Sequence, residues 1–201
     1  MLDRRARGTT TAVFTPLARA LLKAGVSPDA VTVVGTVGVS LGALLLYPAG
    51  HLFAGTMVIT LFVFSDLVDG IMARLAGTTG RWGSFLDSTL DRVQDASVFL
   101  ALCWWGFGVG QEPLAGALAA VCLALGMLVS YVRAKAESLG FTAAGGLAER
   151  AERLVLTLVV TGLVGLGLPA VALTVALGLL AAASAVTVIQ RILSVRSQTR
   201  P

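Results

Sequence analysis

Residues 66–91 read DLVDGIMARLAGTTGRWGSFLDSTLD and contain four aspartates, Asp66, Asp69, Asp87 and Asp91, at the ends of two apolar segments. Each segment is apolar enough to cross a membrane, where carboxylates are costly and therefore usually functional. Spacings of three and four residues put each pair of aspartates on one face of a helix. Two such faces, joined by the short turn at residues 77–80, can bind the same cations.

The composition indicates an integral membrane protein. Hydrophobic residues make up 56% of the chain and charged residues 13%, and the mean hydropathy is +0.88. A soluble domain has about 25% charged residues, so this chain has too few charges to cover a water-exposed surface. Its 201 residues accommodate about six spans of about 20 residues each. We therefore expect an all-α membrane protein with no second globular domain.

The apolar runs predict six transmembrane helices preceded by an amphipathic juxtamembrane helix. The juxtamembrane helix covers residues 9–24, presents Phe14, Leu17, Leu21 and Leu22 on one face, and ends at Gly25. Ser27 is a suitable N-cap for the first span. The six predicted spans are residues 28–47, 52–75, 83–107, 114–137, 148–167 and 170–193. The predicted parts are an N-terminal segment (1–27), a six-helix domain (28–193) and a basic tail (194–201).

The distribution of basic residues predicts the orientation in the membrane. All fifteen lysines and arginines fall on one side of the six-span arrangement, and such residues favour the cytoplasmic side. We therefore expect a multi-pass protein of the plasma membrane whose termini and aspartates face the cytoplasm. Membrane lipids with anionic head groups account for the net charge of +4, so no nucleic-acid partner is expected.

The aspartates are suited to divalent cations. Mg²⁺ is usually held by a few carboxylates together with substrate phosphates, and two ions can activate a nucleophile and stabilise a leaving phosphate. Only Arg74, Arg81 and Arg92 lie near in sequence, too few to neutralise the carboxylates. Gly70 and Gly83 allow a substrate or a facing helix to approach the backbone closely.

Two other classes of protein also hold carboxylates in a membrane. A small cation transporter would need polar residues along a whole pathway, whereas the carboxylates here gather toward one face. An intramembrane prenyltransferase also uses aspartate motifs and Mg²⁺, with its two motifs in separate halves of a longer bundle. We expect an enzyme acting on a pyrophosphate substrate, with transport as the alternative of another class.

The pattern D-x-x-D-G-x-x-A-R-x(8)-G-x-x-x-D-x-x-x-D, from Asp66 to Asp91, resembles the signature of the CDP-alcohol phosphatidyltransferases. The resemblance implies that Asp66, Asp69, Asp87 and Asp91 bind two Mg²⁺ ions, with Mn²⁺ as the other candidate metal. It further implies that Asp91 is the catalytic base and that the protein is a homodimer. The implied contacts to CDP-diacylglycerol are Asp29, Ala30, Val31, Thr32, Gly70, Arg74 and Gly80. Asp29 stands where this family usually has asparagine.

The family's reaction is attack of an acceptor hydroxyl on the lipid-side phosphate of CDP-diacylglycerol, with release of CMP. Arg133, Lys135, Arg153 and Arg191 lie at the ends of three predicted spans and suit a phosphorylated acceptor. Residues 130–137 and 149–153 are similar to the actinobacterial phosphatidylinositol phosphate synthases, which implies inositol 1-phosphate. Glycerol 3-phosphate, the acceptor of a phosphatidylglycerophosphate synthase, is the alternative. Asp95 is expected to pair with Arg92 or to support the metal ligands.

Overall fold

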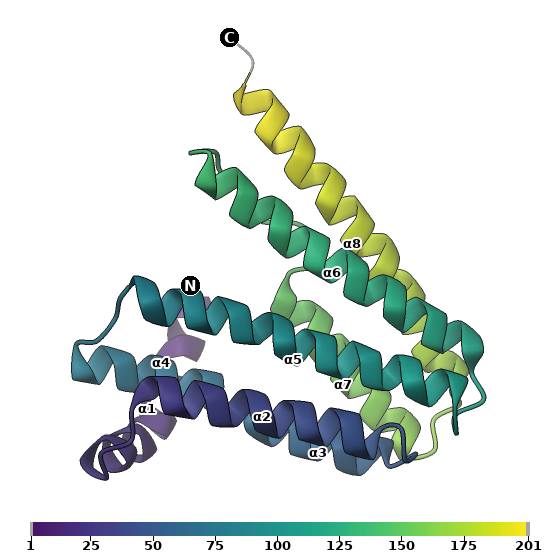
Figure 1. Cartoon of the computed structure of the whole chain (residues 1–201), viewed down its shortest axis with the longest axis horizontal. Helices are drawn as coiled ribbons and strands as arrows, with labels where there is room; N and C mark the ends of the chain where they lie inside the picture. The colour runs from purple at the N-terminus through teal and green to yellow at the C-terminus, as the bar shows by residue number, and fades with distance from the viewer. Residues whose placement is uncertain (1, 200–201) are drawn as a thin grey trace. The chain divides into compact units, whose positions relative to one another are not determined.

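The computed structural model describes the backbone of residues 2–199 and the side chains of residues 13–199. This part of the chain is helical, without strands (Figure 1). Its helices are α1 (Leu2–Lys23), α2 (Pro28–Leu46), α3 (Leu52–Val63), α4 (Ser65–Ala76), α5 (Arg81–Phe107), α6 (Pro113–Ser138), α7 (Arg150–Gly165) and α8 (Val171–Gln198). The side chains of Arg4, Arg5 and Arg7, and the whole of Arg200, lie outside the described residues.

Every segment predicted to be helical contains a helix, and most ends agree within a few residues. The exception is the predicted span 52–75, which is interrupted at Phe64 and forms the two helices α3 and α4. Close packing marks this point, because a Cβ atom on Gly35 of α2 would clash with the side chain of Ser65. The sequence at this break contains no proline or glycine, so the break could not be predicted from helix-breaking residues.

Four helical stretches are long and apolar enough to cross a membrane: Pro28–Leu46, Leu52–Ala76, Pro113–Ser138 and Val171–Gln198. The protein is therefore a membrane protein. Among the described residues, α5 is long enough but has Asp91, Arg92 and Asp95 within its more apolar part, and α7 has only 16 residues, about 24 Å of helix. The two predicted spans that are not among these four stretches are therefore those that correspond to α5 and α7.

The helices fold into two compact units, of which the first contains the described residues up to Gly42 and residues Met57–Gln94. Its apolar core lies between α1 and α4, where Ala18, Val68, Ile71 and Met72 are buried. Phe14, Leu21 and Leu22 pack against this core, whereas Leu17 is 49% exposed. The exposed Leu17 side chain is available to the membrane surface, on which this face of α1 is predicted to lie.

The connection between α1 and α2 sets the start of α2. Gly25 adopts a left-handed conformation, with φ of 79°, and ends α1 as predicted. Ser27 then accepts a hydrogen bond from the backbone N–H of Ala30 through its Oγ atom, at 3.2 Å, which confirms it as the N-cap residue. This turn brings the first residues of α2 to the cavity described below.

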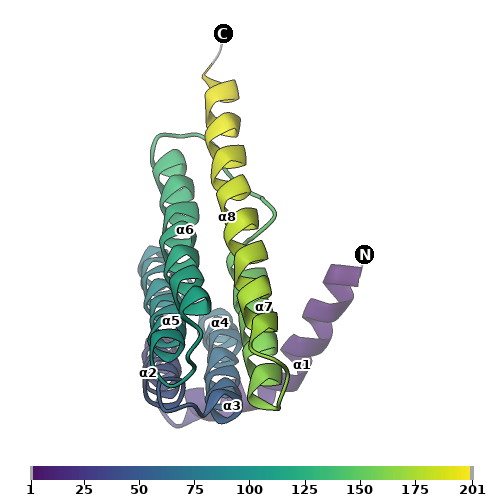
Figure 2. The same cartoon turned by 90° about the vertical axis from the view of Figure 1, so that its right-hand side faces the viewer.

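The second unit contains residues Ala43–Thr56 and the described residues from Asp95 onward. Within it α6 and α7 both pack beside α8 (Figure 2). The loop before α7 is tied to α8, because Thr187 Oγ1 accepts the backbone N–H groups of Leu147 and Ala148 at 3.0 and 3.1 Å. The loop between α6 and α7 is therefore held by hydrogen bonds.

Candidate active site

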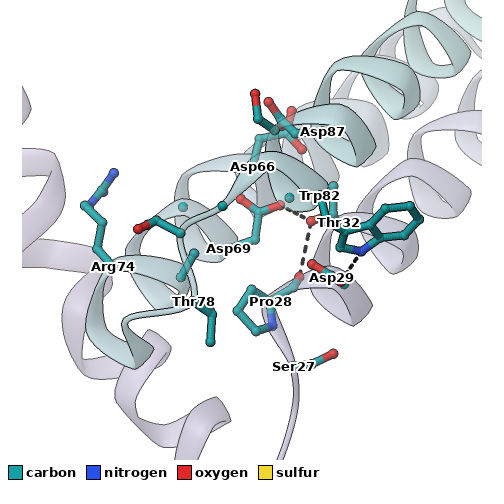
Figure 3. Close-up of a pocket in the computed structure, with 16 residues that line it drawn as sticks. Ser27, Pro28, Asp29, Thr32, Asp66, Asp69, Arg74, Thr78, Trp82 and Asp87 are labelled. Carbon is teal, nitrogen blue, oxygen red and sulfur yellow. Dashed lines mark hydrogen bonds between the residues drawn. The ribbon is translucent and has the colours of Figure 1, made fainter.

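A cavity of about 580 Å³ opens in the first unit, between the first residues of α2, the helix α4 and the beginning of α5 (Figure 3). Three of the four predicted metal ligands, Asp66, Asp69 and Asp87, line it, whereas Asp91 is not among its lining residues. Of the residues predicted to contact CDP-diacylglycerol, the cavity is lined by Asp29, Thr32, Gly70, Arg74 and Gly80, but not by Ala30 or Val31.

The turn after α4 positions these groups. Gly77 has a left-handed φ of 65° and ends α4, and the Thr78 N–H bonds to the Ala73 carbonyl at 3.0 Å. Residues 77–80 then turn the chain into α5, so that Asp87 of α5 lines the same cavity as Asp66 and Asp69 of α4. A short polar turn thus joins the two halves of the aspartate pattern, as predicted.

The carboxylate of Asp69 is held by Thr32 of α2. Thr32 Oγ1 donates a hydrogen bond to Asp69 Oδ2 at 2.5 Å, and each residue is 7% exposed. A buried carboxylate needs such a donor. Thr32 therefore orients a predicted metal ligand, in addition to lining the cavity where the sequence predicted a substrate contact.

Gln94 holds the other α4 carboxylate and was missed in the sequence. Its side chain is 1% exposed, and Nε2 lies 3.3 Å from Asp66 Oδ1 and 3.2 Å from Thr36 Oγ1. Gln94 follows Asp87 by seven residues and Asp91 by three, which places it on the aspartate face of α5. This spacing is the signal that could have identified it.

Asp91 is half-buried beside a cation. Its Oδ2 atom lies 3.5 Å from Arg92 NH1, and the same guanidinium nitrogen donates to the Ser88 carbonyl at 2.7 Å. Arg92 therefore pairs with Asp91 and the backbone, and the expected Arg92–Asp95 pair does not form.

The donor set at the cavity fits a divalent cation. Carboxylate oxygens are hard ligands of the kind that Mg²⁺ and Mn²⁺ prefer, and Arg74 is the one cationic residue among those described at the cavity. No three acidic, histidine or cysteine side chains within residues 13–199 converge on a single point. Four carboxylates at one cavity, with one arginine, nevertheless form a strongly anionic site: Asp29, Asp66, Asp69 and Asp87.

The two glycines beside the aspartates are not required for packing within the described chain. A Cβ atom on Gly83 would have no neighbour within 4 Å, and one on Gly70 would lie 3.8 Å from Arg74 NH1. By contrast, a Cβ atom on Gly42 of α2 would come within 2.8 Å of Val58 Cγ1. The absence of side chains at Gly70 and Gly83 leaves the space beside the carboxylates open.

Asp95 belongs to the second unit and pairs with two arginines of α7. Its Oδ2 atom lies 3.0 Å from Arg153 NH2, and its Oδ1 atom 3.3 Å from Arg150 Nε. Arg153 is 1% exposed, and its NH1 atom donates to the Ala148 carbonyl at 3.3 Å. The predicted pairing of Asp95 with Arg92 was wrong, because long-range ion pairs with α7 replace the local one.

The four residues predicted to bind the acceptor phosphate fall into two groups. Arg153 and Arg191 are buried and bonded. Arg191 donates through NH1 to the Val129 carbonyl at 2.8 Å and through Nε to the Gly145 carbonyl at 3.0 Å. Arg133 and Lys135 are exposed, and Arg133 Nε pairs with Glu137 Oε1 at 2.8 Å.

Comparison with known proteins decides the family. The sequence profile of the CDP-alcohol phosphatidyltransferases matches residues 25–195. The chain belongs to the CDP-alcohol phosphatidyltransferase family. This match confirms the family resemblance that was drawn from the aspartate pattern, and it makes the protein an enzyme of phospholipid biosynthesis.

Individual relatives and solved structures are also similar to this chain over most of its length. The phosphatidylinositol phosphate synthase of Streptomyces avermitilis is 52% identical over 99% of this chain and 84% of its own length. That of Cutibacterium acnes is 49% identical over 92% of both chains. A crystal structure of the Mycobacterium tuberculosis phosphatidylinositol phosphate synthase with CDP-DAG bound is 42% identical, with a TM-score of 0.86 over 92% of this chain and 94% of that chain. A structure of the same protein in complex with manganese and citrate gives a TM-score of 0.87 at 41% identity, over 92% of this chain and 89% of that chain.

Proposed function

We propose that this enzyme transfers the phosphatidyl group of CDP-diacylglycerol to inositol 1-phosphate, giving phosphatidylinositol phosphate and CMP. The observation that carries the proposal is the cavity at which Asp66, Asp69 and Asp87 meet beside the open positions of Gly70 and Gly83. An anionic hollow with little side-chain bulk suits a pyrophosphate bound together with divalent cations. The names of the relatives support the choice of acceptor.

In the proposed reaction an inositol hydroxyl oxygen attacks the phosphorus of the lipid-side phosphate. A phosphate ester bond forms, the bond between that phosphorus and the oxygen of CMP breaks, and the hydroxyl proton passes to Asp91. Two Mg²⁺ ions, or Mn²⁺ in their place, would be held by Asp66, Asp69, Asp87 and Asp91. These ions, when bound, offset the charge of the pyrophosphate and of the departing CMP. Thr32 and Gln94 keep the Asp69 and Asp66 carboxylates oriented.

The nucleotide and its pyrophosphate occupy the cavity in this proposal. The contacts to CDP-diacylglycerol come from Asp29 and Thr32 of α2, Gly70 and Arg74 of α4, and Gly80 of the turn, whereas Ala30 and Val31 do not line the cavity. Arg74 supplies the positive charge. The backbone N–H groups of Ala30 and Val31 already bond to Ser27, at 3.2 Å to Oγ and 3.3 Å to the carbonyl, so Arg74 carries more of the phosphate binding than the end of α2.

Arg133, Lys135, Arg153 and Arg191 bind the acceptor phosphate. One observation favours Arg153 in particular, because its Nε atom is buried and has no hydrogen-bond partner among the described residues. Such orphaned donors are rare in folded proteins, and a phosphate oxygen would satisfy this one. Asp95 holds the same guanidinium at NH2 and leaves Nε available.

The membrane arrangement follows from the same proposal. The helices α5 and α7 complete six spans, α1 within residues 1–27 lies at the membrane surface, and residues 194–201 form a basic tail after the six-helix domain of residues 28–193. The termini and the aspartates face the cytoplasm, with the protein in the plasma membrane as a homodimer. CMP and the soluble acceptor then exchange with the cytoplasm while the acyl chains stay in lipid.

The test is CMP release by the purified full-length protein in detergent with CDP-diacylglycerol and Mg²⁺. Each acceptor is supplied alone: inositol 1-phosphate, glycerol 3-phosphate or free inositol. We expect CMP only with inositol 1-phosphate, and none after EDTA. CMP release with glycerol 3-phosphate but not with inositol 1-phosphate would make the enzyme a phosphatidylglycerophosphate synthase instead.

A further inference from the structure

Trp82, at the start of α5, is an exposed aromatic residue with a fixed position at the cavity. Its side chain is 63% exposed, yet the indole Nε1–H donates a hydrogen bond to Asp29 Oδ2 of α2 at 2.9 Å (Figure 3). Both residues line the cavity. Large exposed aromatic rings are normally mobile on a surface, whereas this one is tied to a second helix.

The two partners have complementary hydrogen-bonding chemistry. An indole can only donate and an ionised carboxylate can only accept. Asp29 lies in the first turn of α2, where the helix dipole favours a negative charge. The carboxylate oxygen of Asp29 therefore accepts the indole hydrogen bond and holds the ring.

The ring also differs from its surroundings. Among the described residues that line the cavity, Trp82 is the only aromatic one, and the others are mostly aspartates, glycines and hydroxyl residues. Aspartates and small polar residues suit phosphates and metal ions, but they give a planar base no surface on which to stack. An indole supplies that surface, and stacking on aromatic rings tolerates any base because each has a π-face.

We infer that Trp82 is a wall of the nucleotide subsite, held by Asp29 so that it stacks on the cytosine base of the substrate. The inference rests on the proposed function for the identity of the nucleotide. Trp82 contributes by stacking, and Asp29, besides its proposed contact with the substrate, positions Trp82. The pyrimidine end of CDP-diacylglycerol is thereby placed between the start of α2 and the start of α5, with the pyrophosphate toward the aspartates.

The experiment measures equilibrium binding of radiolabelled CMP, with Mg²⁺, to the full-length protein in detergent. We expect Trp82→Ala to weaken CMP binding and to raise the KM for CDP-diacylglycerol, each about tenfold, without changing the KM for the acceptor. Trp82→Phe keeps a ring but loses the donor, and Asp29→Ala removes the acceptor. Trp82→Phe and Asp29→Ala should each lower the affinity for CMP less than Trp82→Ala does. The double variant that combines Trp82→Phe with Asp29→Ala should bind CMP no more weakly than the weaker of these two single variants.

Conservative and matched variants separate this from a folding effect. Asp29→Asn retains an amide oxygen for the indole and should weaken CMP binding less than Asp29→Ala. Trp104→Ala is the control, because Trp104 is 64% exposed on the same helix and is not a lining residue; it should leave CMP affinity unchanged. Unchanged CMP affinity in Trp82→Ala, or an equal rise of KM for both substrates, would overturn the inference.

The two proposals fail in different ways. Trp82-dependent binding of CMP by a protein that releases no CMP from CDP-diacylglycerol would refute the proposed function and support the inference. Normal turnover with inositol 1-phosphate, together with Trp82→Ala behaving as the parent, would refute the inference alone.

Discussion

Thr32 on α2 and Asp69 on α4 are joined by a hydrogen bond of 2.5 Å between Oγ1 and Oδ2, although they lie 37 residues apart in the chain. The bond links the helix that begins at the cavity with the helix that carries the first aspartate pair. A matching bond joins Gln94 on α5 to Asp66. Both α4 carboxylates are thus oriented by polar side chains of other helices.

Replacing Thr32 by valine tests the first of these bonds. Valine keeps the shape but removes the donor to a buried carboxylate, which typically costs about 1.5–3 kcal/mol. We expect the rate of CMP release at limiting Mg²⁺ to fall by about 10- to 100-fold, with partial recovery as Mg²⁺ is raised. Thr32→Ser retains the hydroxyl and should stay within a few-fold of the parent. Equal activity of the valine and serine variants would contradict the role of the hydroxyl.

Gln94→Leu tests the second bond. The substitution removes the amide donor to Asp66 from a position that is 1% exposed, so we expect a raised Mg²⁺ requirement, measured by titrating the metal in the CMP-release assay. Thr36→Val is the comparison, because it removes the other partner of the Gln94 amide and leaves the bond to Asp66. If Thr36→Val is as damaging as Gln94→Leu, Gln94 supports packing and does not orient Asp66.

Alanine substitutions at Gly83 and Gly42 distinguish a glycine that leaves space for substrate from a glycine that is needed for helix packing. Gly83→Ala adds a methyl group where the described chain has no atom within 4 Å, so thermal stability should be nearly unchanged while activity falls, because the methyl group enters the space for substrate. Gly42→Ala places its methyl group against Val58 and should lower the melting temperature. A fully active Gly83→Ala variant would show that the open position serves no substrate.

Asp91 and Asp95 lie one turn apart on α5, but we expect their replacement by asparagine to affect different properties. Asp91→Asn should affect activity, and Asp95→Asn should affect stability. Asp91→Asn should keep the fold and part of the CDP-diacylglycerol binding but abolish CMP release, because the base is lost. Asp95→Asn leaves the buried guanidinium of Arg153 without its carboxylate, which typically costs about 3–5 kcal/mol of stability. Thermal unfolding and CMP release measured on both variants check this. A stable Asp95→Asn variant, or an active Asp91→Asn variant, would contradict the respective assignment.

The acceptor residues can be tested through the split between the two Michaelis constants. Arg191→Ala and Lys135→Ala should raise the KM for inositol 1-phosphate and leave that for CDP-diacylglycerol unchanged. The expected rise is larger for Arg191, whose buried guanidinium has a fixed position. An equal change in both constants would indicate that Arg191 only ties the loop at Gly145 to α8.

Local patterns in the sequence predicted the helices and the convergence of three aspartates, because spacings of three and four residues determine a helix face without tertiary information. The partners of those aspartates were harder to predict. Thr32, Gln94 and Trp82 act across 28 to 53 residues of chain, and nothing local specifies such pairings. Asp95 shows the same limit, since its nearest arginine in sequence is Arg92 but its ion pairs are with α7.

The most direct test of the account is a competition in one vessel. The purified enzyme is given CDP-diacylglycerol and Mg²⁺ with equal concentrations of inositol 1-phosphate and glycerol 3-phosphate, and the lipid products are identified by mass spectrometry. We predict phosphatidylinositol phosphate as the dominant product, and neither product in the Asp91→Asn variant. Phosphatidylglycerophosphate as the dominant product would contradict the proposed acceptor.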